Sequence, residues 1–300
     1  MAKNIAASRQ KKPGGLSDKV SDIVLVVICA AVMLIVAYPL YYVLVASFSD
    51  PYDVYAGKTF LLPSQFTLKG YQAVFADSAL FSGFINSIKY TVIGTIYSVV
   101  MIYLVAYPLS VKDLPGRKYI SLFFVITMYF GGGVVPFFLL VKDLGLYGNR
   151  FAVVIALAFN AFNMIILRNF FESLPPDLEE AAMLDGASPF RIFWQIDLPL
   201  MKPALATVTL YFIVDRWNEW FWSNLLFLDS KMWPMQLELR QILWTSSALA
   251  ADVPAELGRR TYADGMKAAA VIVTMLPIMC VYPFLQKYFA KGVMIGAIKS

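Results

Sequence analysis

The chain has 300 residues, of which 59% are hydrophobic and 15% charged, against about 45–50% and 25% in soluble globular proteins. A soluble chain of this composition would expose large apolar patches, so the composition excludes an ordinary soluble domain and predicts a polytopic membrane protein. The formal net charge is +5, but the basic residues lie in short segments between apolar runs and form no single patch, which argues against a nucleic-acid partner.

The residue types that several kinds of chemistry require are missing. The sequence has no histidine, which removes a histidine general base and most zinc sites. Cys29 and Cys280 both lie within apolar runs, where we expect small buried side chains and no disulfide framework. No G-x-x-x-x-G-K-[ST] motif occurs, so the chain has no P-loop for ATP. We therefore predict no catalytic residue, no metal site and no cofactor bound by this chain.

The predicted elements begin after a polar segment, residues 1–22, which we interpret as a cytoplasmic leader. Residues 23–48 form an apolar run longer than the roughly 20 residues of a spanning helix, and far longer than the roughly 7–15 of a signal-peptide core, so an uncleaved first span is expected. Five more apolar runs follow, approximately residues 85–110, 119–141, 151–171, 204–228 and 267–289. The predicted fold class is an all-α membrane protein with six transmembrane helices.

Six spans place both termini on the same side of the membrane. The shortest segment on that side, residues 111–118, contains Lys112, Arg117 and Lys118, and basic residues in short loops mark the cytoplasmic side. Both termini are therefore expected in the cytoplasm. The long outer segments, residues 49–84 and 229–265, either contain structure of their own, face a partner, or simply cap the bundle.

The third apolar run is interrupted by Gly131, Gly132 and Gly133, followed by Pro136. Glycine and proline weaken a helix, and irregular backbone inside a membrane requires protein or a water-filled cavity around it. Two interpretations stay open: a broken helix beside a translocation path, or a point of close helix packing.

The fifth run contains ionisable groups, which are costly within a span and functional by default. Arg216 and Glu219 are three residues apart and can pair on one helical face. The neighbouring polar and aromatic side chains either line a polar cavity that binds sugar, or form an interfacial belt with an internal ion pair. The candidate translocation-path residues, with two asparagines of the fourth run, are Asn160, Asn163, Asp215, Arg216, Trp217, Asn218, Glu219 and Trp220.

A polar segment, residues 174–203, separates the fourth and fifth runs. Pro175 and Pro176 open a helix whose first turns are acidic, as the helix dipole prefers. Asp185-Gly186 is a turn signal, and Ser188 then caps a second helix, which we expect to end at Leu198-Pro199. The pattern predicts a cytoplasmic helix–turn–helix.

This segment resembles the loop of binding-protein-dependent ABC importer permeases, with its pattern E-A-A-x-x-D-G-A and a later I-x-L-P-x-x-x-P. The resemblance implies the type I importer transmembrane fold in the bacterial cytoplasmic membrane, with a core of five helices over residues 85–289 and a cytoplasmic tail over residues 290–300. It also implies that the loop is a coupling helix seated in an ATP-hydrolysing subunit. The matching positions, expected to form the docking face and turn, are Glu180, Ala181, Ala182, Asp185, Gly186 and Ala187.

The same resemblance implies the partners. They are a second homologous permease, two ATP-binding cassette subunits that hold ATP and magnesium, an extracellular solute-binding protein and the lipid bilayer. In related permeases the C-terminal tail reaches between the ATPase subunits, and Lys287, Lys291 and Lys299 are placed to do likewise.

The chain most resembles the carbohydrate branch, of the maltose-permease second-subunit type. The glycine triplet, the run from Asp215 to Trp222 and the tail from Lys291 to Lys299 are similar to members linked to plant- or algal-polysaccharide oligosaccharides. An oligosaccharide, neutral or uronic, is the expected cargo. Importers of other solutes, an ion-coupled carrier and an integral-membrane enzyme remain as alternatives, although the coupling loop has no role in the last two.

Overall fold

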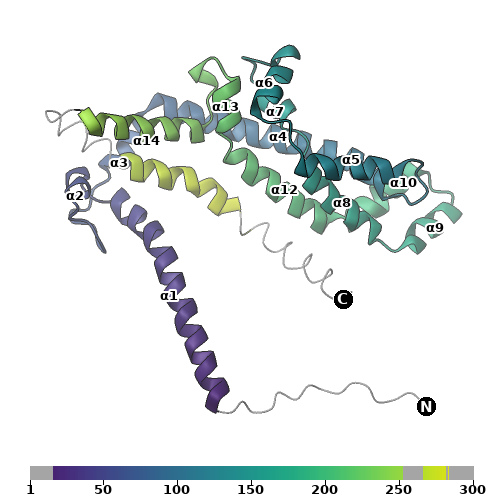
Figure 1. Ribbon diagram of the computed structural model, residues 1–300, viewed down its shortest axis with the longest axis horizontal. Helices are drawn as coiled ribbons and strands as arrows, with labels where there is room; N and C mark the ends of the chain where they lie inside the picture. Colours follow the sequence, from purple (N-terminus) through teal and green to yellow (C-terminus); the bar gives the residue numbers. More distant parts are fainter. Residues whose placement is uncertain (1–15, 253–265, 282, 284–300) are drawn as a thin grey trace.

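The computed structural model describes residues 16–252, 266–281 and 283, and within them the chain is helical (Figure 1). The one pairing of extended backbone in these residues is an isolated bridge between Ser49 and Phe66. The helices are α1 (Leu16–Ser47), α2 (Pro51–Tyr55), α3 (Lys69–Ala76), α4 (Ser78–Ser110), α5 (Arg117–Tyr129), α6 (Val134–Asp143), α7 (Ala152–Ala156), α8 (Ala161–Glu172), α9 (Pro176–Leu184), α10 (Pro189–Ile192), the π-helix η1 (Phe193–Asp197), α11 (Leu198–Leu200), α12 (Lys202–Trp217), α13 (Phe221–Leu226), the 3₁₀-helix η2 (Ser230–Met232), α14 (Met235–Asp252) and a last helix, Met266–Val281.

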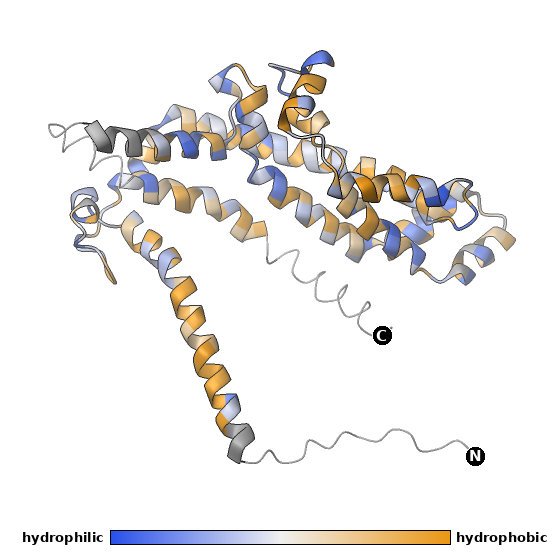
Figure 2. Cartoon of the chain, in the orientation of Figure 1, coloured by the Kyte–Doolittle hydropathy of each residue, from blue (hydrophilic) through white to orange (hydrophobic). Residues whose placement is uncertain are grey.

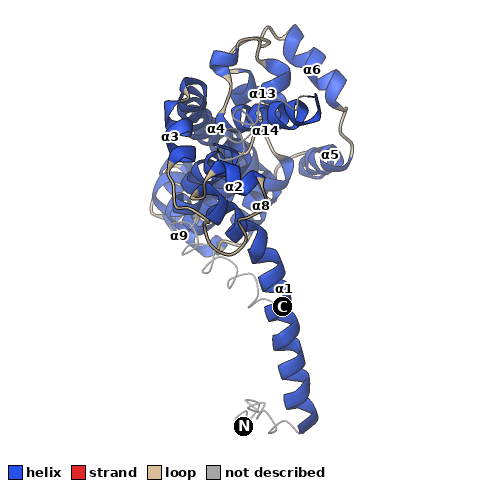
Figure 3. Cartoon of the chain, turned by 90° about the vertical axis from the view of Figure 1, so that its left-hand side faces the viewer, coloured by secondary structure: helices blue, strands red, loops and turns tan. Residues whose placement is uncertain are grey.

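The first predicted span is confirmed as a straight apolar helix. Val20–Ser47 is long and apolar enough to cross a membrane, and most of it projects away from the body of the protein (Figures 2 and 3). Cys29 lies on this exposed helix and Cys280 is exposed on the last one, so the expectation that both cysteines are buried is wrong. The most apolar stretch of α1 is not buried against the described part of the chain, so lipid or another protein segment must cover it.

Helix α4 is the centre of the bundle. Its 33 residues span about 50 Å, well beyond the roughly 30 Å of a bilayer core. It begins seven residues before the predicted second span, because the Asp77 side chain accepts hydrogen bonds from the Ala79 and Leu80 amides at 2.8 and 3.1 Å and caps the helix. Helices α8 and α12 pack along its second half, around buried Ile102, Leu167 and Val208, and α14 packs along its first half.

The three middle spans are broken helices. The third is divided into α5 and α6, which bend by 117° at the glycine triplet. A Cβ on Gly131 would meet no atom within 4 Å, and Gly133 has a φ of +86°, so within this chain the triplet serves the bend and not close packing. The fourth is divided into α7 and α8, and the fifth into α12 and α13, with a further 74° bend before α12.

In the described residues two helices are long and apolar enough to span a membrane alone, and four spans result if each bent pair counts as one. The sixth predicted run, residues 267–289, corresponds to Met266–Val281, while its last residues lie outside the described part, as does the tail. Of the predicted leader, residues 1–22, residues 1–15 also lie outside the described part and the rest form the start of α1. The six apolar runs are therefore recovered as helical segments, with the third, fourth and fifth interrupted.

The outer segments contain structure of their own. The segment between α13 and α14 is fastened to α4: the Asn86 side chain donates to the Lys231 and Trp233 carbonyls at 2.9 and 3.1 Å. The Tyr90 hydroxyl donates to the Met232 carbonyl at 2.9 Å. These bonds hold the start of α14 beside α13, and from there α14 runs toward the end of the bundle opposite α9 (Figure 1).

Candidate functional site

The polar segment after α8 is the predicted helix–turn–helix. Helix α9 begins with Pro176 and ends at Leu184, and Gly186 follows in the left-handed region with a φ of +77°. The Ala187 amide donates to the Ala182 carbonyl and the Gly186 amide to the Met183 carbonyl, both at 3.0 Å. This pair of bonds is the Schellman motif, which needs a residue that tolerates a left-handed backbone at its turn.

The turn end of α9 is exposed. Leu184 is 90% exposed and Met183 57%, which is unusual for apolar side chains at a polar end of the protein. Of the six residues expected to dock, four are exposed and two are half-buried: Glu180, Ala181, Asp185 and Gly186, and then Ala182 and Ala187. Their side chains are therefore available to another protein.

The second helix begins where the sequence predicts and ends within one residue of the predicted position. Ser188 caps it, with its carbonyl accepting from the Ile192 amide at 3.0 Å. It ends at Leu200, one residue after the predicted Leu198-Pro199, but it is irregular: residues Phe193–Asp197 form a π-helix and Pro199 lies in the first turn of α11. A wider π turn accommodates a proline, which lacks the amide hydrogen of a regular helix.

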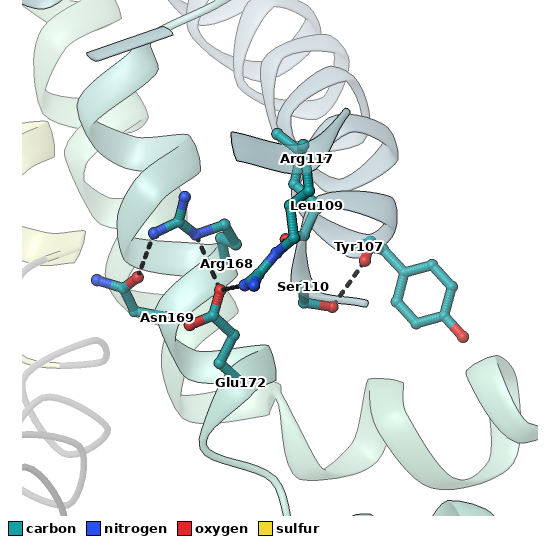
Figure 4. A network of polar contacts seen from close by, with 7 residues as sticks. All are labelled: Tyr107, Leu109, Ser110, Arg117, Arg168, Asn169 and Glu172. Atoms are coloured by element: carbon teal, nitrogen blue, oxygen red, sulfur yellow. Dashed lines mark hydrogen bonds and ion pairs between the residues drawn. The ribbon is translucent and has the colours of Figure 1, made fainter. Parts of the chain in front are cut away.

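A network of polar contacts ties the base of this loop to three helices (Figure 4). Arg117 of α5 donates through Nε to the Leu109 carbonyl of α4 at 2.8 Å and through Nη2 to the Glu172 carboxylate. Arg168 of α8 lies 3.1 Å from the same carboxylate oxygen. Glu172 is the last residue of α8, so the entry to the loop is held against α4 and α5.

A buried arginine lies at the broken middle of the bundle. Arg216 of α12 is 5% exposed and donates to the Val153 carbonyl at 2.5 Å, to the Ser98 hydroxyl at 2.9 Å, and to the Leu157 carbonyl. Val153 and Leu157 belong to α7 and its end, where helix carbonyls lack partners of their own. Gly94 of α4 leaves the space, because a Cβ there would be 3.2 Å from Arg216 Nε.

The predicted pairing of Arg216 with Glu219 is wrong. Helix α12 ends at Trp217, so Glu219 is not on the same helical face. The Glu219 carboxylate instead accepts from the Trp222 amide at 2.6 Å and the Ser223 amide at 3.1 Å, and so caps α13. The arginine and the carboxylate line one small cavity but form no ion pair within 4.0 Å among the described residues. Arg216 thus stabilises the break between α7 and α8, and Glu219 stabilises the break between α12 and α13.

The other candidate path residues divide by exposure. Trp217 is 4% exposed and donates through Nε1 to the Thr274 carbonyl of the last helix at 3.0 Å, so its ring is not available to a substrate. Asn163 is 5% exposed. Its backbone N–H donates to the side-chain oxygen of Asn160, which caps α8, at 3.0 Å. The candidates that remain accessible are Asn160, Asp215, Asn218 and, half-buried, Glu219 and Trp220.

Sequence reasoning missed three features. Gly94 and Ser98 lie four residues apart on α4, and such spacing of small residues is a recognisable signal of close helix approach. The Arg117–Glu172 contact joins positions 55 residues apart and has no local signal. Arg240 of α14 lies with its guanidinium carbon 3.5 Å from the Trp220 ring centre, also without a signal in the sequence pattern. Residues 16–252, 266–281 and 283 contain no group of three or more side chains placed to hold a metal ion.

A bundle of apolar, broken helices with a polar helix–turn–helix exposed at one end is the architecture of a membrane transport subunit. Residues 79–295 match the family of binding-protein-dependent transport system inner membrane components, and the chain belongs to that family. It is therefore a multi-pass inner-membrane component of an ABC transport system, of type I importer fold.

Relatives and a solved structure agree with this assignment. The chain is 40% identical over 269 residues, 89% of its length and 94% of the relative's, to a polygalacturonan/rhamnogalacturonan transport system permease protein of Bacillus subtilis (strain 168). It is 28% identical over 269 residues, 88% of its length and 85% of the relative's, to a diacetylchitobiose uptake system permease protein of Streptomyces coelicolor. A chain of a bacterial ABC transporter involved in the import of the acidic polysaccharide alginate superposes with a TM-score of 0.84 at 36% identity, over 92% of this chain and 99% of that one. The predicted resemblance to carbohydrate-type permeases is confirmed.

Proposed function

We propose that this chain forms one half of the membrane pathway of an ATP-driven importer and docks on an ATP-hydrolysing subunit through residues 180–187, the docking surface. The observation that carries the proposal is the 90% exposure of Leu184 at the Schellman turn, beside the exposed carboxylates of Glu180 and Asp185. A short helix with an exposed apolar tip and acidic neighbours has the composition of one that lies in a groove of another protein. ATP and magnesium bind to that partner and not to this chain.

The network at Glu172 supports transmission of movement from the docking surface. Because Arg117 joins the Glu172 carboxylate to the end of α4, a displacement of the loop carries α4, α5 and α8 with it. Closure of two ATP-hydrolysing subunits then rocks the helix bundle as a rigid body, which is one of the known kinds of transport switch.

A second, homologous permease subunit completes the pathway. Helix α1 is apolar and exposed along nearly its whole length, and Asn160, Asp215 and Asn218 lie open on the surface of this chain. Polar groups at membrane depth need a cavity or a protein neighbour, and a second subunit facing them supplies both. The accessible candidates then line the path between the two subunits, and an extracellular binding protein delivers the cargo.

The cargo is an oligosaccharide, a proposal supported by the carbohydrate names of the relatives. Both termini are placed in the cytoplasm, together with the docking surface, because the short segment at residues 111–118 carries Lys112, Arg117 and Lys118. The end of the molecule that holds α14 then faces outward.

The test is co-purification from the native cells, with the wild type beside Leu184→Asp. The added carboxylate places an unpaired charge in the groove, and we expect the ATP-hydrolysing subunit to fall at least tenfold relative to the second permease. Leu62→Asp is the matched control, since Leu62 is 75% exposed and lies in the segment between α2 and α3, away from the docking surface.

Loss of the ATP-hydrolysing subunit in the Leu184 variant alone supports the docking surface. Equal recovery with both variants overturns it. If the wild type brings down a second permease but no ATP-hydrolysing subunit, ATP-driven transport itself is wrong for this chain.

A further inference from the structure

Arg240 lies between two tryptophan rings at the outer half of the bundle. Its guanidinium carbon is 3.5 Å from the ring centre of Trp220, at the start of α13, and 5.9 Å from that of Trp244, one turn further along α14. Contacts of this kind act through the face of the guanidinium and hold it at a fixed place. The arginine is therefore positioned before any ligand arrives.

The positive charge of Arg240 is not neutralised by the described part of the chain. The ion pairs there involve other residues, and no carboxylate among the described side chains of residues 16–244, 266–281 and 283 lies within 4.0 Å of its guanidinium. Stacking on a ring uses the flat face of the group and leaves its edge, which carries the N–H donors, free for an acceptor. A half-buried cation whose donor edge meets no carboxylate in the described part of the chain attracts an anion.

The neighbouring side chains add two further kinds of contact. Gln236, one turn before Arg240 on α14, donates to the Asn218 side chain at 3.4 Å, and Asn218 is exposed. Trp244 is 68% exposed and offers most of its ring to solvent. Amides, a guanidinium edge and an open indole thus follow one another along a strip made by α14 and the end of α12.

We propose that Asn218, Gln236, Arg240 and Trp244, with Trp220 behind the arginine, bind a uronate residue of an acidic oligosaccharide. The carboxylate pairs with the donor edge of Arg240, the hydroxyls bond to the amides, and the apolar face of the sugar ring rests on Trp244. A neutral sugar leaves the arginine without an anion. This assignment rests on the proposed function and narrows its cargo class. The alginate importer whose chain superposes on this one also acts on an acidic polysaccharide.

The place of the site agrees with a role in receiving cargo. Helix α14 and the docking surface on α9 lie at opposite ends of the long axis (Figure 1), so under the proposed orientation the strip is on the outer side. The binding protein delivers cargo from that side.

The experiment measures binding of trigalacturonate and of its methyl ester to the purified importer complex. The ester keeps every hydroxyl and ring and removes the charge. The wild type is expected to bind the acid at least about tenfold more tightly than the ester, because a hydrogen bond between charged groups stabilises a complex by more than a tenfold change in Kd requires. Arg240→Gln is expected to abolish the difference, and Arg240→Lys to retain a part of it. Lys231→Gln, which removes an exposed charge from the same outer segment, is expected to leave it unchanged.

Equal affinity of the wild type for acid and ester overturns the uronate site, and so does an unchanged preference in the Arg240→Gln variant. The comparison of acid with ester needs no variant, so it holds even if Arg240→Gln fails to fold. Recovery of the ATP-hydrolysing subunit is measured in the same preparations. Its presence without an acid preference rejects this site and leaves the proposed function intact, while its absence rejects the proposed function.

Discussion

The Arg117 guanidinium donates to the Glu172 carboxylate and to the Leu109 carbonyl, so one side chain joins the start of α5, the end of α8 and the end of α4. The two charged side chains are 28% and 30% exposed, and Arg168 lies on the same carboxylate oxygen. A single carboxylate thus fixes the two arginines at the entry to the docking loop.

Replacing Glu172 by Gln is expected to lower the free energy of unfolding by about 1 kcal/mol, because a partly exposed ion pair with two arginines is worth little more than that. The change in Arg117→Gln should be similar, and the double variant should lose less than the sum of the two. Thermal unfolding in detergent measures all three. Lys118→Gln, an exposed neighbour, is the control; full additivity of the two network variants would show that the contact contributes nothing.

Arg216→Met is expected to destabilise the chain by about 2 kcal/mol. The substitution leaves the Val153 and Leu157 carbonyls and the Ser98 hydroxyl without their donor, although it also removes the cost of burying a charge. Asp215→Asn, at the exposed position beside it, should leave stability within about 0.5 kcal/mol of the wild type. Chemical unfolding followed by tryptophan fluorescence compares the two. Equal stabilities would mean that the arginine is kept for transport and not for holding the bundle.

The helix–turn–helix could be predicted from the sequence because its signals are local. Prolines open both helices, Asp185-Gly186 marks the turn, and Ser188 caps the second helix. The six apolar runs were visible for the same reason, since composition alone defines them. The end of the second helix was predicted to within one residue, but the π-helix before Pro199 has no local signal in the sequence.

The breaks in the fourth and fifth spans could not be read from composition. Apolar residues continue across residues 157–159, so hydropathy does not mark the helix end there. In the fifth run Asn218 and Glu219 are polar, but no glycine or proline stands near them to mark the end of a helix. The expected Arg216–Glu219 pair assumed an unbroken helix. The true acceptors for Arg216 on α7 lie 63 and 59 residues away along the chain, and no local pattern reveals such partners.

Gly186→Ala is expected to weaken the turn through backbone strain alone. No atom lies within 4 Å of the new Cβ, so the cost of about 1 kcal/mol comes from the left-handed φ of +77°. The Ala187 amide, which donates to the Ala182 carbonyl, should exchange its hydrogen about fivefold faster. Gly57→Ala, just after α2, carries the same strain, with a φ of +67° and no atom within 4 Å of the new Cβ. It should leave the exchange rate of the Ala187 amide unchanged. Unaltered exchange in the Gly186 variant would show that the Schellman turn does not stabilise the loop.

Glu238 on α14 is expected to make the stability of the outer segment depend on pH. Burial, and to a smaller extent the charge of Asp77, raises the pKa of Glu238 to about 7 from a usual value of 4.5. Between these values the folded chain holds a proton that the unfolded chain has lost. The free energy of unfolding therefore falls as pH rises through this window, and it stops falling above about pH 7.

Glu238→Gln, which stays neutral, should remove that dependence. The variant should match the wild type near pH 5 and unfold at a higher temperature near pH 8. The measurement is thermal unfolding of the purified complex from pH 5 to pH 8. Asp77→Asn is a poor control because Asp77 caps α4, so Asp143→Asn, on the exposed last residue of α6, is used instead. A wild type whose unfolding temperature rises from pH 5 to pH 8, or a glutamine variant that falls in parallel with it, would mean that Glu238 is ionised in the folded chain well below pH 7.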